Sequence, residues 1–565
     1  MKKMSEWKQV IMKLRRAKNA KAQLALLNFF SRQKELRPSQ LLEYHDALLF
    51  LSAWPDDKKV FSFAQDELKR LAELLQTHQH DKSWQYRLSG SGLPFTELRA
   101  QYSAALVSWL LKKFHDDVVP LEAGIKNDEL QALLRSILPE VEFYQAALDE
   151  LPAWRRIELV SGSYRDQEAL SWMIDQLQNK DWPPVLKDFV YDQLKIFVRW
   201  KLKEEFYTRS FLRLPLTKIY DPDSHKNKWN SRTIDERLAK QQKLKKEEKE
   251  ELIAIARVSL ALYYRETDPF NFAGKSETFR FDMGNGTEIA LFGMIKERQL
   301  SLESYIGYMI FRNGIPVAYG GGWLFGFRCR IGINTYPPFR GGRSSELFLQ
   351  VLRLYRQEYG VKTFVVKPYQ FGKKNPEGLK SGAFWFYYKL GFRPSDKVTK
   401  KLAAAEYKKI NSNRSYKTPV DLLKTFTNGN LELKLANNNA ENFDAEKLSF
   451  VVTKLVRDRF AGNRVKASSF FKKQAISFFG LQQHPFHNNN ENKVFLNWAS
   501  VLSCLPGREN WNKNQRAEFL KIVERKSSGC EKKFLLQLQR HRRFWSSFKK
   551  IPTNISDGTA MKVKL

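Results

Sequence analysis

The residues with the clearest chemical signal are 340–345, which lie directly before a run whose apolar side chains recur at helical spacing. Backbone N–H groups in the first turn of a helix have no partner within the helix, and the helix dipole adds positive charge at that end. Two arginines and two glycines stand at this point of the chain. A phosphate-binding site is therefore predicted, and the alternative is a helix that simply begins with basic residues. The residues of this predicted site are Arg340, Gly341, Gly342, Arg343, Ser344 and Ser345.

A second chemical signal is a run of five aromatic residues, 384–388, on a short predicted helix that ends before Gly391. Consecutive residues advance by about 100° around a helix, so five side chains cannot all face one core. At least one of them should reach a cleft or the surface. A tyrosine hydroxyl in a cleft can donate a proton, and Tyr387 and Tyr388 are the candidates; packing alone is the alternative.

The elements that must position these residues are strands followed by two helices. Three β-rich runs, 305–311, 315–325 and 329–335, are joined by Asn313-Gly314 and by a turn near residue 326, which predicts an antiparallel meander. A helix over 345–358 and a fourth strand over 361–366 follow. A right-handed crossover should place 329–335 and 361–366 side by side and parallel. We expect these two strands to part at their C-terminal ends and leave a cleft that ends at 340–345.

This order of elements, together with the spacing of Ala383, Tyr387, Lys389, Gly391 and Phe392, resembles the GNAT superfamily of N-acyltransferases. The resemblance covers about residues 250–400. It implies acetyl-coenzyme A or another acyl-coenzyme A as cosubstrate, with its pyrophosphate at the glycine-rich loop. It also implies that Tyr387 protonates the departing thiolate and that a backbone N–H of the third meander strand holds the oxyanion.

A general base is harder to place from the sequence. No Asp or Glu lies between Arg328 and Arg343. Glu303 or Glu288 could act through a water molecule, or the amine could arrive already deprotonated.

Metal and membrane chemistry are not expected. The close histidine pairs, His78/His80 and His484/His487, have neither cysteines nor a convincing set of carboxylates beside them, so no metal site is predicted. Three cysteines are too few for a disulfide framework and suit a reducing compartment. No run approaches the roughly 18 apolar residues of a membrane span. We expect a cytoplasmic protein with no membrane partner.

The composition of the 565 residues indicates several domains. We expect a multidomain α and α+β protein whose first 220 residues are successive amphipathic helices, one of them over Thr96–Phe114. Residues 221–250 read as a charged linker or helix, and 251–410 as a GNAT-like mixed sheet with flanking helices. Residues 411–440 read as a linker. Residues 441–565 read as a basic helical domain.

The formal net charge of +35 predicts polyanionic partners, or else basic side chains spread over solvated helix faces. Residues 446–565 carry 24 Lys or Arg against 8 Asp or Glu, interleaved with aromatic residues. Such a pattern suits nucleic acid, because aromatic rings stack on bases while cations hold phosphates. At helical spacing the same rings would form a core.

The leading hypothesis is an N-acyltransferase that moves an acyl group from acyl-coenzyme A to an amine of unknown class. One alternative is a non-catalytic acyl-coenzyme A-binding or interaction protein with a GNAT-like fold. Another is a nucleic-acid-associated binding protein.

Overall fold

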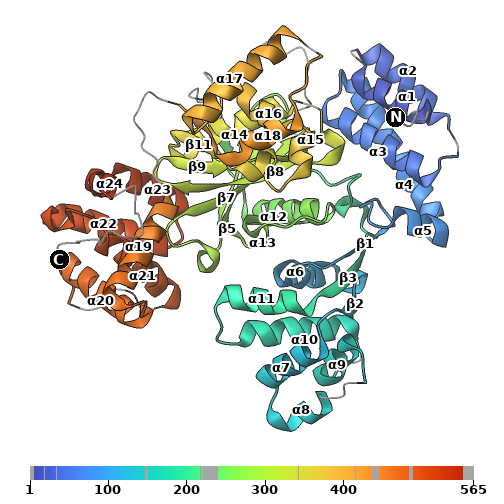
Figure 1. Cartoon of the computed structure of the whole chain (residues 1–565). Coiled ribbons are helices and arrows are strands. Elements are labelled where there is room, and N and C mark those ends of the chain that lie inside the picture. The colour runs from blue at the N-terminus through green and yellow to red at the C-terminus, as the bar shows by residue number, and fades with distance from the viewer. Residues whose placement is uncertain are drawn as a thin grey trace.

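The computed structural model is a mixed α/β structure in which helical units surround one large mixed sheet (Figure 1). It describes the chain apart from residues 1–5, 18, 34, 147–149, 164, 217–218, 220–233, 235–238, 342, 414, 436–443, 483–485, 487 and 552–565. Most of the charged segment 221–250 therefore lies outside the described residues.

The first unit is helical, and side chains at its helix starts help to begin each helix. Asn19, Asp57 and Asp81 each accept a backbone N–H of the first turn, which satisfies a donor that the helix itself leaves unpaired. The apolar stripe of the third helix, including Leu41 and Leu48, is fully buried. The helices are α1 (Glu6–Arg16), α2 (Ala20–Ser31), α3 (Pro38–Ala53), α4 (Lys58–Thr77) and α5 (Lys82–Leu88).

A second unit contains a three-stranded antiparallel sheet, so the prediction of helices alone for the first 220 residues is corrected here. The predicted helix 96–114 is a strand followed by a shorter helix. Strand β3 alternates buried Ile196, Val198 and Trp200 with more exposed residues, which is strand periodicity over only six residues. The elements are β1 (Glu97–Ala100), α6 (Ala104–Phe114), β2 (Val118–Ala123), α7 (Asn127–Ile137), α8 (Glu140–Ala146), α9 (Ala153–Ser161), α10 (Asp166–Asn179), α11 (Pro184–Leu194) and β3 (Ile196–Lys201).

The central sheet has the strand order β12-β13-β11-β9-β8-β7-β6-β5-β4, with β10 paired to β8. Its strands are β4 (Lys240–Gln242), β5 (Ala273–Asp282), β6 (Thr287–Met294), β7 (Ser304–Arg312), β8 (Ile315–Phe325), β9 (Arg328–Ile331), β10 (Asn334–Thr335), β11 (Thr363–Val366), β12 (Arg393–Pro394) and β13 (Leu431–Lys434). Its helices are α12 (Lys246–Ala261), α13 (Asp268–Asn271), α14 (Ser344–Tyr359), α15 (Pro376–Lys380), α16 (Ala383–Lys389), α17 (Lys397–Ser412) and α18 (Val420–Thr425).

The predicted meander and the parallel pairing across the crossover are confirmed, but the third strand, predicted over 329–335, ends at Ile331, and residues 334–335 form the separate strand β10. Strands β7, β8 and β9 pair antiparallel, and Asn313 and Gly314 both have positive φ at the first turn, as a type I′ turn requires. Strands β9 and β11 are parallel, with Arg328 opposite Thr363 and Arg330 opposite Val365. Helix α14 connects them and ends at Gly360, which has a φ of 64°.

Residues 411–440 were expected to form a linker, but their described part contains α18 and β13. Strand β13 lies between β11 and β12 and pairs antiparallel with both. Leu431 and Leu433 are its two buried side chains. Four residues give too short an alternation to be recognised against the polar residues around them.

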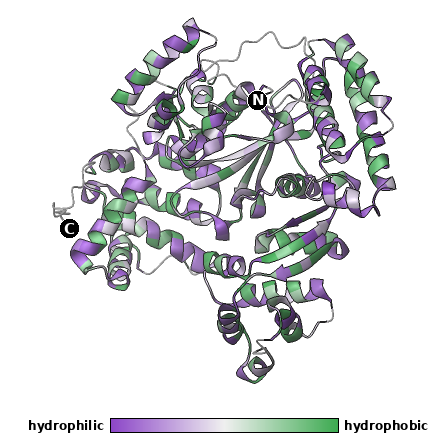
Figure 2. Ribbon diagram, turned by 45° about the vertical axis from the view of Figure 1, so that its right-hand side comes forward, coloured by the Kyte–Doolittle hydropathy of each residue, from purple (hydrophilic) through white to green (hydrophobic). Residues whose placement is uncertain are grey.

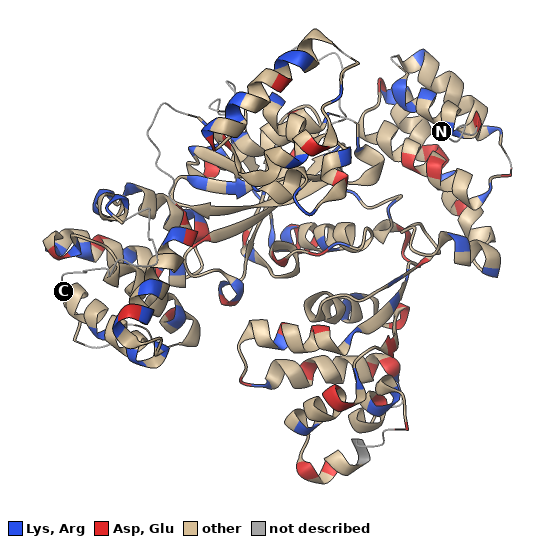
Figure 3. Ribbon diagram, in the orientation of Figure 1, with Lys and Arg blue, Asp and Glu red and all other residues tan. Residues whose placement is uncertain are grey.

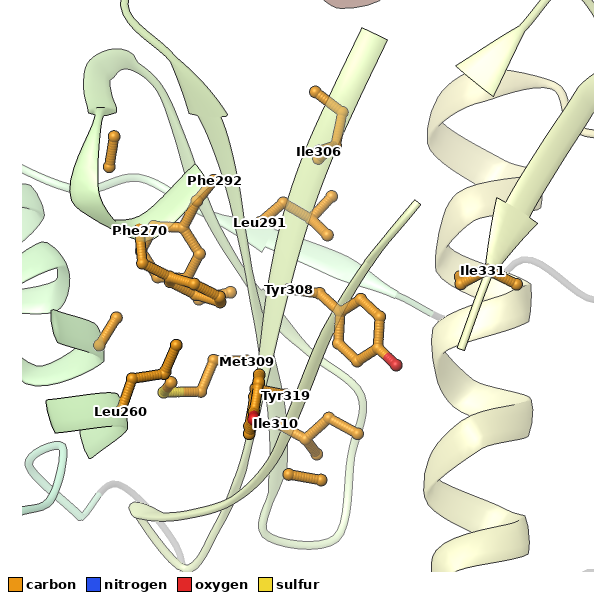
Figure 4. Close-up of a cluster of buried hydrophobic side chains, with 14 of the residues drawn as sticks. Leu260, Phe270, Leu291, Phe292, Ile306, Tyr308, Met309, Ile310, Tyr319 and Ile331 are labelled. Carbon is orange, nitrogen blue, oxygen red and sulfur yellow. The ribbon is translucent and has the colours of Figure 1, made fainter. Parts of the chain in front are cut away.

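The core lies on both faces of the central sheet. Figure 4 shows that Met309 and Tyr308, neighbours on β7, point to opposite sides of the strand. Met309 points toward Leu260 of α12, and Phe270 of α13 lies on the same side. Tyr308 lies against Tyr355 of α14, with ring centroids 6.1 Å apart. Hydrophobic and hydrophilic residues alternate along the peripheral helices from turn to turn (Figure 2), as expected for helices that bury one side.

The last unit is helical, as predicted, and its aromatic residues form a core. Trp498, Phe519, Phe534 and Phe544 are buried and in ring contact. The helices are α19 (Ala445–Phe460), α20 (Arg464–Phe479), α21 (Asn489–Ser503), α22 (Lys513–Ser527), α23 (Glu531–Arg540) and α24 (Arg542–Lys549). Among the helices that the structure describes, none combines the length and the apolar character needed to cross a bilayer.

Candidate functional site

A cavity of about 510 Å³ opens where β9 and β11 part, between the start of α14 and the helix α16. The two strands pair over three residues, and the chain after Ile331 then returns to β8 as β10, with Asn334 opposite Tyr319. The opening that this leaves is closed at the sides by the 3-10 turns Pro337–Phe339 and Pro368–Phe371 and by α15. The cleft predicted between these two strands is therefore present.

Gly332 and Ile333 connect β9 to β10, and Ile333 lines the cavity. The hydroxyl of Tyr308 donates a 2.5 Å hydrogen bond to the carbonyl oxygen of Gly332. Gly320 on β8 permits this contact, because a Cβ there would lie 2.5 Å from the Tyr308 oxygen and 2.6 Å from the Gly332 oxygen. The Tyr308 hydroxyl thus holds the carbonyl group of Gly332 in a fixed direction.

Tyr387 lines the cavity and is 2% exposed. Its ring packs against Phe348 of α14 and against Phe392. Burial raises the pKa of its hydroxyl, and a backbone hydrogen bond from Ile333 acts in the opposite direction, as an N–H donor to the phenol oxygen would. The hydroxyl therefore keeps its proton at neutral pH and lies next to the Gly332–Ile333 backbone.

Tyr388 has different surroundings. Its ring lies under the guanidinium of Arg393, 4.0 Å from the ring centroid, and packs with Trp385 and Tyr407. It is 4% exposed and is not among the residues that line the cavity. Of the two tyrosines proposed from the sequence, Tyr387 alone reaches this opening.

The predicted phosphate loop divides into residues that line the cavity and residues that do not. Arg340, Gly341 and Ser344 line it. Arg343 and Ser345 are outside it, and an Arg343 guanidinium nitrogen lies 3.7 Å from Glu346. Gly342 lies outside the described residues.

Three features leave the start of α14 open to an anion. Gly341 has a φ of 81°, and a Cβ on it would meet no atom within 4 Å. No side chain caps the first turn of α14, whose N-cap is Arg343. The hydroxyl of Thr335 donates to that of Ser344 at 3.4 Å, so both hydroxyls lie at the cavity wall.

The electrostatics of the cavity are mostly positive. Arg340 and Arg265 both line it, and both lower the pKa of Tyr319, although burial raises that pKa overall. Glu377 is the only carboxylate among the described lining residues. It accepts a 2.6 Å hydrogen bond from Nη1 of Arg340, and both side chains of this pair are more than half exposed.

The first unit supports the loop from behind. Arg15 of α1 donates hydrogen bonds of 2.8 Å to the carbonyl of Pro338 and 3.0 Å to that of Arg340. Trp54, at the end of α3, packs against Phe339 with ring centroids 5.9 Å apart. Residues far away in the chain thus fix the backbone on which Arg340 stands.

The two glutamates considered as a general base lie elsewhere. Glu303 receives two 2.7 Å hydrogen bonds from Arg330, and Glu288 is paired with Arg280. Neither lines the cavity. A base for the reaction is therefore absent from both predicted positions.

Sequence reasoning missed several lining residues that come from loops. The amide of Gln370 lies against Gly332, where an added Cβ would be 2.6 Å from its Cδ. Asn375 caps α15 by accepting the N–H of Gly378 at 3.2 Å. The Asn375-Pro376 pair signals a helix start, but no local pattern places that helix beside a cavity.

Among the described residues, no three His, Cys, Asp or Glu side chains converge as metal ligands would. His78 is stacked on Trp84, and His484 and His487 lie outside the described residues.

No known family model, curated protein or solved structure matches the chain.

Proposed function

We propose that the protein is an N-acyltransferase that transfers an acyl group from acyl-coenzyme A to an amine, on a GNAT-like central domain. The observation that carries this proposal is the cavity at the parting of β9 and β11. It brings the guanidinium of Arg340, the open start of α14 and the hydroxyl of Tyr387 to one opening. The crossover through α14 between the parallel strands β9 and β11 also suits that resemblance.

The residues present fit a thioester whose carrier has a pyrophosphate. Arg340 and Arg265 supply positive charge, and α14 begins at the cavity wall with Ser344, after an N-cap residue whose side chain makes no capping hydrogen bond. Gly341 lets phosphate oxygens approach the backbone, because nothing lies within 4 Å of its missing side chain. Glu377 competes for Arg340, so we expect its ion pair to open when phosphate binds.

The proposed chemistry is direct transfer. The lone pair of a neutral amine attacks the thioester carbonyl, a C–N bond forms, the C–S bond breaks, and the amine loses one proton. The Ile333 N–H is engaged by the Tyr387 hydroxyl, so we assign the developing oxyanion to another backbone N–H of the segment 329–335. Tyr387 gives its proton to the departing thiolate and recovers one from solvent or the amine.

The second candidate is a protein that binds acyl-coenzyme A without catalysis. The absence of a carboxylate beside the Gly332–Ile333 backbone, among the described lining residues, favours it. Mass analysis of acylated amines after incubation with acetyl-coenzyme A separates the two. The three cysteines form no disulfide, which suits our proposal of a cytoplasmic location.

Calorimetric titration with acetyl-coenzyme A tests the site itself. Arg340→Ala should weaken binding by about 1 to 3 kcal/mol, because a charged hydrogen bond to phosphate is removed. Arg343→Ala is the matched control. It removes the same charge three residues away, outside the cavity, and should leave the affinity within about twofold. Equal losses in the two variants, or none in either, would show that the phosphate does not lie at Arg340.

A further inference from the structure

A second pocket, of about 330 Å³, lies on the other side of the α12–α13 connection from the cavity just described. Three elements form it: the start of α6, the end of α11 and the segment 266–271. This volume is at the small end of ligand pockets, so it suits a small molecule and not a folded partner. Figure 1 shows α6 and α11 facing the α12–α13 layer of the central sheet.

The pocket carries an excess of negative charge. Asp192, Glu266 and Asp268 line it, and Lys195 is the only cation among its described lining residues. When all four groups are ionised, two negative charges are left over. Burial raises the pKa of each of the three carboxyl groups. A neighbouring aspartate raises it further, namely Asp188 for the two aspartates and Asp192 for Glu266. A bound cation would therefore stabilise the ionised carboxylates.

An unpartnered hydroxyl provides an independent sign of a ligand. Tyr191 is 2% exposed, lines the pocket, and its hydroxyl has no hydrogen-bond partner among the described residues. A buried polar group without a partner destabilises the folded protein, so such groups are rare without a reason. Burial raises the pKa of this hydroxyl, and the negative charges of Glu266 and Asp192 raise it further. An ammonium group between them would give all three oxygens a donor.

Glu266 is held rigidly at this place. Its carboxylate accepts the Ser103 N–H at 3.0 Å, the Ser103 hydroxyl at 2.6 Å and the Asn271 amide at 2.7 Å. The charge is thus fixed in direction before any ligand arrives. Tyr102 and Tyr191 also line the pocket.

We propose that this pocket binds a small aliphatic diamine in its doubly protonated form. Two excess charges match two ammonium groups, and the carboxylates come from separate elements and do not converge on one point as metal ligands would. In a further step, which rests on the proposed function, this diamine is the acyl acceptor after one of its two ammonium groups has lost a proton to solvent.

Tyr305 interacts with one lining residue of each cavity. The hydroxyl of Tyr305 is hydrogen-bonded with Thr267, which lines the acidic pocket. Tyr305 also interacts electrostatically with Tyr319, which lines the cavity with Tyr387. For transfer, the neutral amino group must leave its carboxylate and reach the acyl group, while the other ammonium group stays in the acidic pocket as an anchor.

Titration of the full chain with 1,4-diaminobutane, without acyl-coenzyme A, tests the pocket. We expect binding at least tenfold tighter than that of butylamine, and none of 1,4-butanediol, because each ammonium pairs with a carboxylate. Asp192→Asn should weaken diamine binding about tenfold or more, since a charged hydrogen bond is removed. Glu73→Gln, on the exposed face of α4, is the control and should bind as the parent does.

Tyr191→Phe is the variant that separates binding from folding. Its hydroxyl contributes no hydrogen bond within the described part of the protein, so the unfolding temperature should stay equal or rise while diamine affinity falls about fivefold. The proposal is overturned if butylamine binds as tightly as the diamine, if the parent binds neither at millimolar concentration, or if Tyr191→Phe and Asp192→Asn both bind as the parent.

The same protein titrated with acetyl-coenzyme A keeps the two proposals apart. Acetyl-coenzyme A binding without diamine binding removes the pocket proposal alone. Diamine binding without acetyl-coenzyme A binding removes the acyltransferase and leaves the diamine site.

Discussion

Tyr387 and Tyr388 are neighbours in the chain, yet their helix turns them toward different surroundings. The Tyr387 hydroxyl faces the Gly332–Ile333 backbone, whereas the Tyr388 ring lies in an aromatic cluster under Arg393. The angular argument for five consecutive aromatic residues required only that at least one of them leaves the core, and Tyr387 and Tyr388 are the two that carry a hydroxyl group. It could not choose between them, because the choice depends on where β9 and α16 lie in space.

Tyr387→Phe should lower kcat by about a hundredfold to ten-thousandfold, the usual range when a general acid is removed. The affinity for acetyl-coenzyme A should hardly change, because a proton donor acts only as charge develops on sulfur. Steady-state rates and calorimetry give the two quantities. Tyr388→Phe is the matched control and should retain the parent rate. A fully active Tyr387→Phe, in a protein that forms acylated product, would remove the tyrosine from the chemical step.

Glu277 on β5 illustrates how the last helical unit affects a single residue of the sheet. Its pKa is raised from 4.5 to about 7, first by burial and then by the carboxylate of Glu531. Lys526 is buried beside it and donates a 2.6 Å hydrogen bond to Glu531. In the folded state Glu277 thus keeps its proton to a higher pH than in the unfolded chain.

The contribution of Glu277 to stability is complete below about pH 4.5 and is lost as the pH rises through about 7. Glu277→Gln removes the titration, so above pH 7 the variant should be the more stable protein, by up to about 3 kcal/mol. Urea unfolding at pH 5 and pH 8 measures this difference. Glu73→Gln should show the same stability difference from the parent at both pH values. A pH-independent effect of Glu277→Gln would mean that the carboxyl is not perturbed.

At the scale of elements, the cavity depends on loops more than on the strands that could be recognised in the sequence. The meander, the crossover helix and their parallel strands have clear periodicities, so their residue ranges could be predicted closely. Strands β1, β3 and β13 have only four to six residues, and β13 is far along the chain from its partner β11. Strands that pair across so many residues leave no local pattern in the sequence. The position of α15, which carries Glu377, likewise could not be predicted from its local sequence.

Helix α15 places Glu377 against Arg340 of the predicted phosphate loop, where we expect it to compete with phosphate. Glu377→Gln should strengthen acetyl-coenzyme A binding by about two- to fivefold, since Arg340 then gives up no ionised partner when phosphate binds. The gain is small because exposed ion pairs contribute at most about 1 kcal/mol. Calorimetry beside Arg340→Ala measures it, and the double variant should bind like Arg340→Ala alone. Weaker binding by Glu377→Gln would instead make Glu377 a residue that orders the loop.

At the scale of the whole molecule, charge is unevenly distributed (Figure 3). Helix α17 carries five lysines against one glutamate, and Lys and Arg recur along the last helices. The aromatic residues expected to stack on bases are mostly core, because Phe471, Phe544 and Trp545 are buried. Binding of RNA or DNA stays a prediction that rests on the cations, and it should weaken steeply with salt.

The last helical unit is also attached to the central sheet and does not stand apart from it. Gln539 donates 2.7 Å hydrogen bonds to the carbonyls of Gly326 and Tyr359, and Trp498 donates one of 3.0 Å to that of Ser301. Trp545 lies on the β8–β9 turn, where a Cβ on Gly326 would be only 2.2 Å from its ring. A domain that the sequence delimits by composition is here packed onto its neighbour.

Trp545→Ala should therefore destabilise the sheet together with the last helices. Truncation of a buried tryptophan typically lowers the free energy of unfolding by about 3 to 5 kcal/mol, and here the ring also packs against Phe325 and Phe327 of the sheet. Urea unfolding followed by far-ultraviolet circular dichroism measures the stability, and hydrogen exchange of β8 and β9 shows which strands become less protected. Phe450→Ala, at a 70% exposed ring of the same unit, is the control and should change stability by less than about 0.5 kcal/mol. If exchange rises in the helices 444–551 alone while β8 and β9 remain protected as in the parent, the last unit folds independently, and its packing on Gly326 adds little to the stability of the sheet.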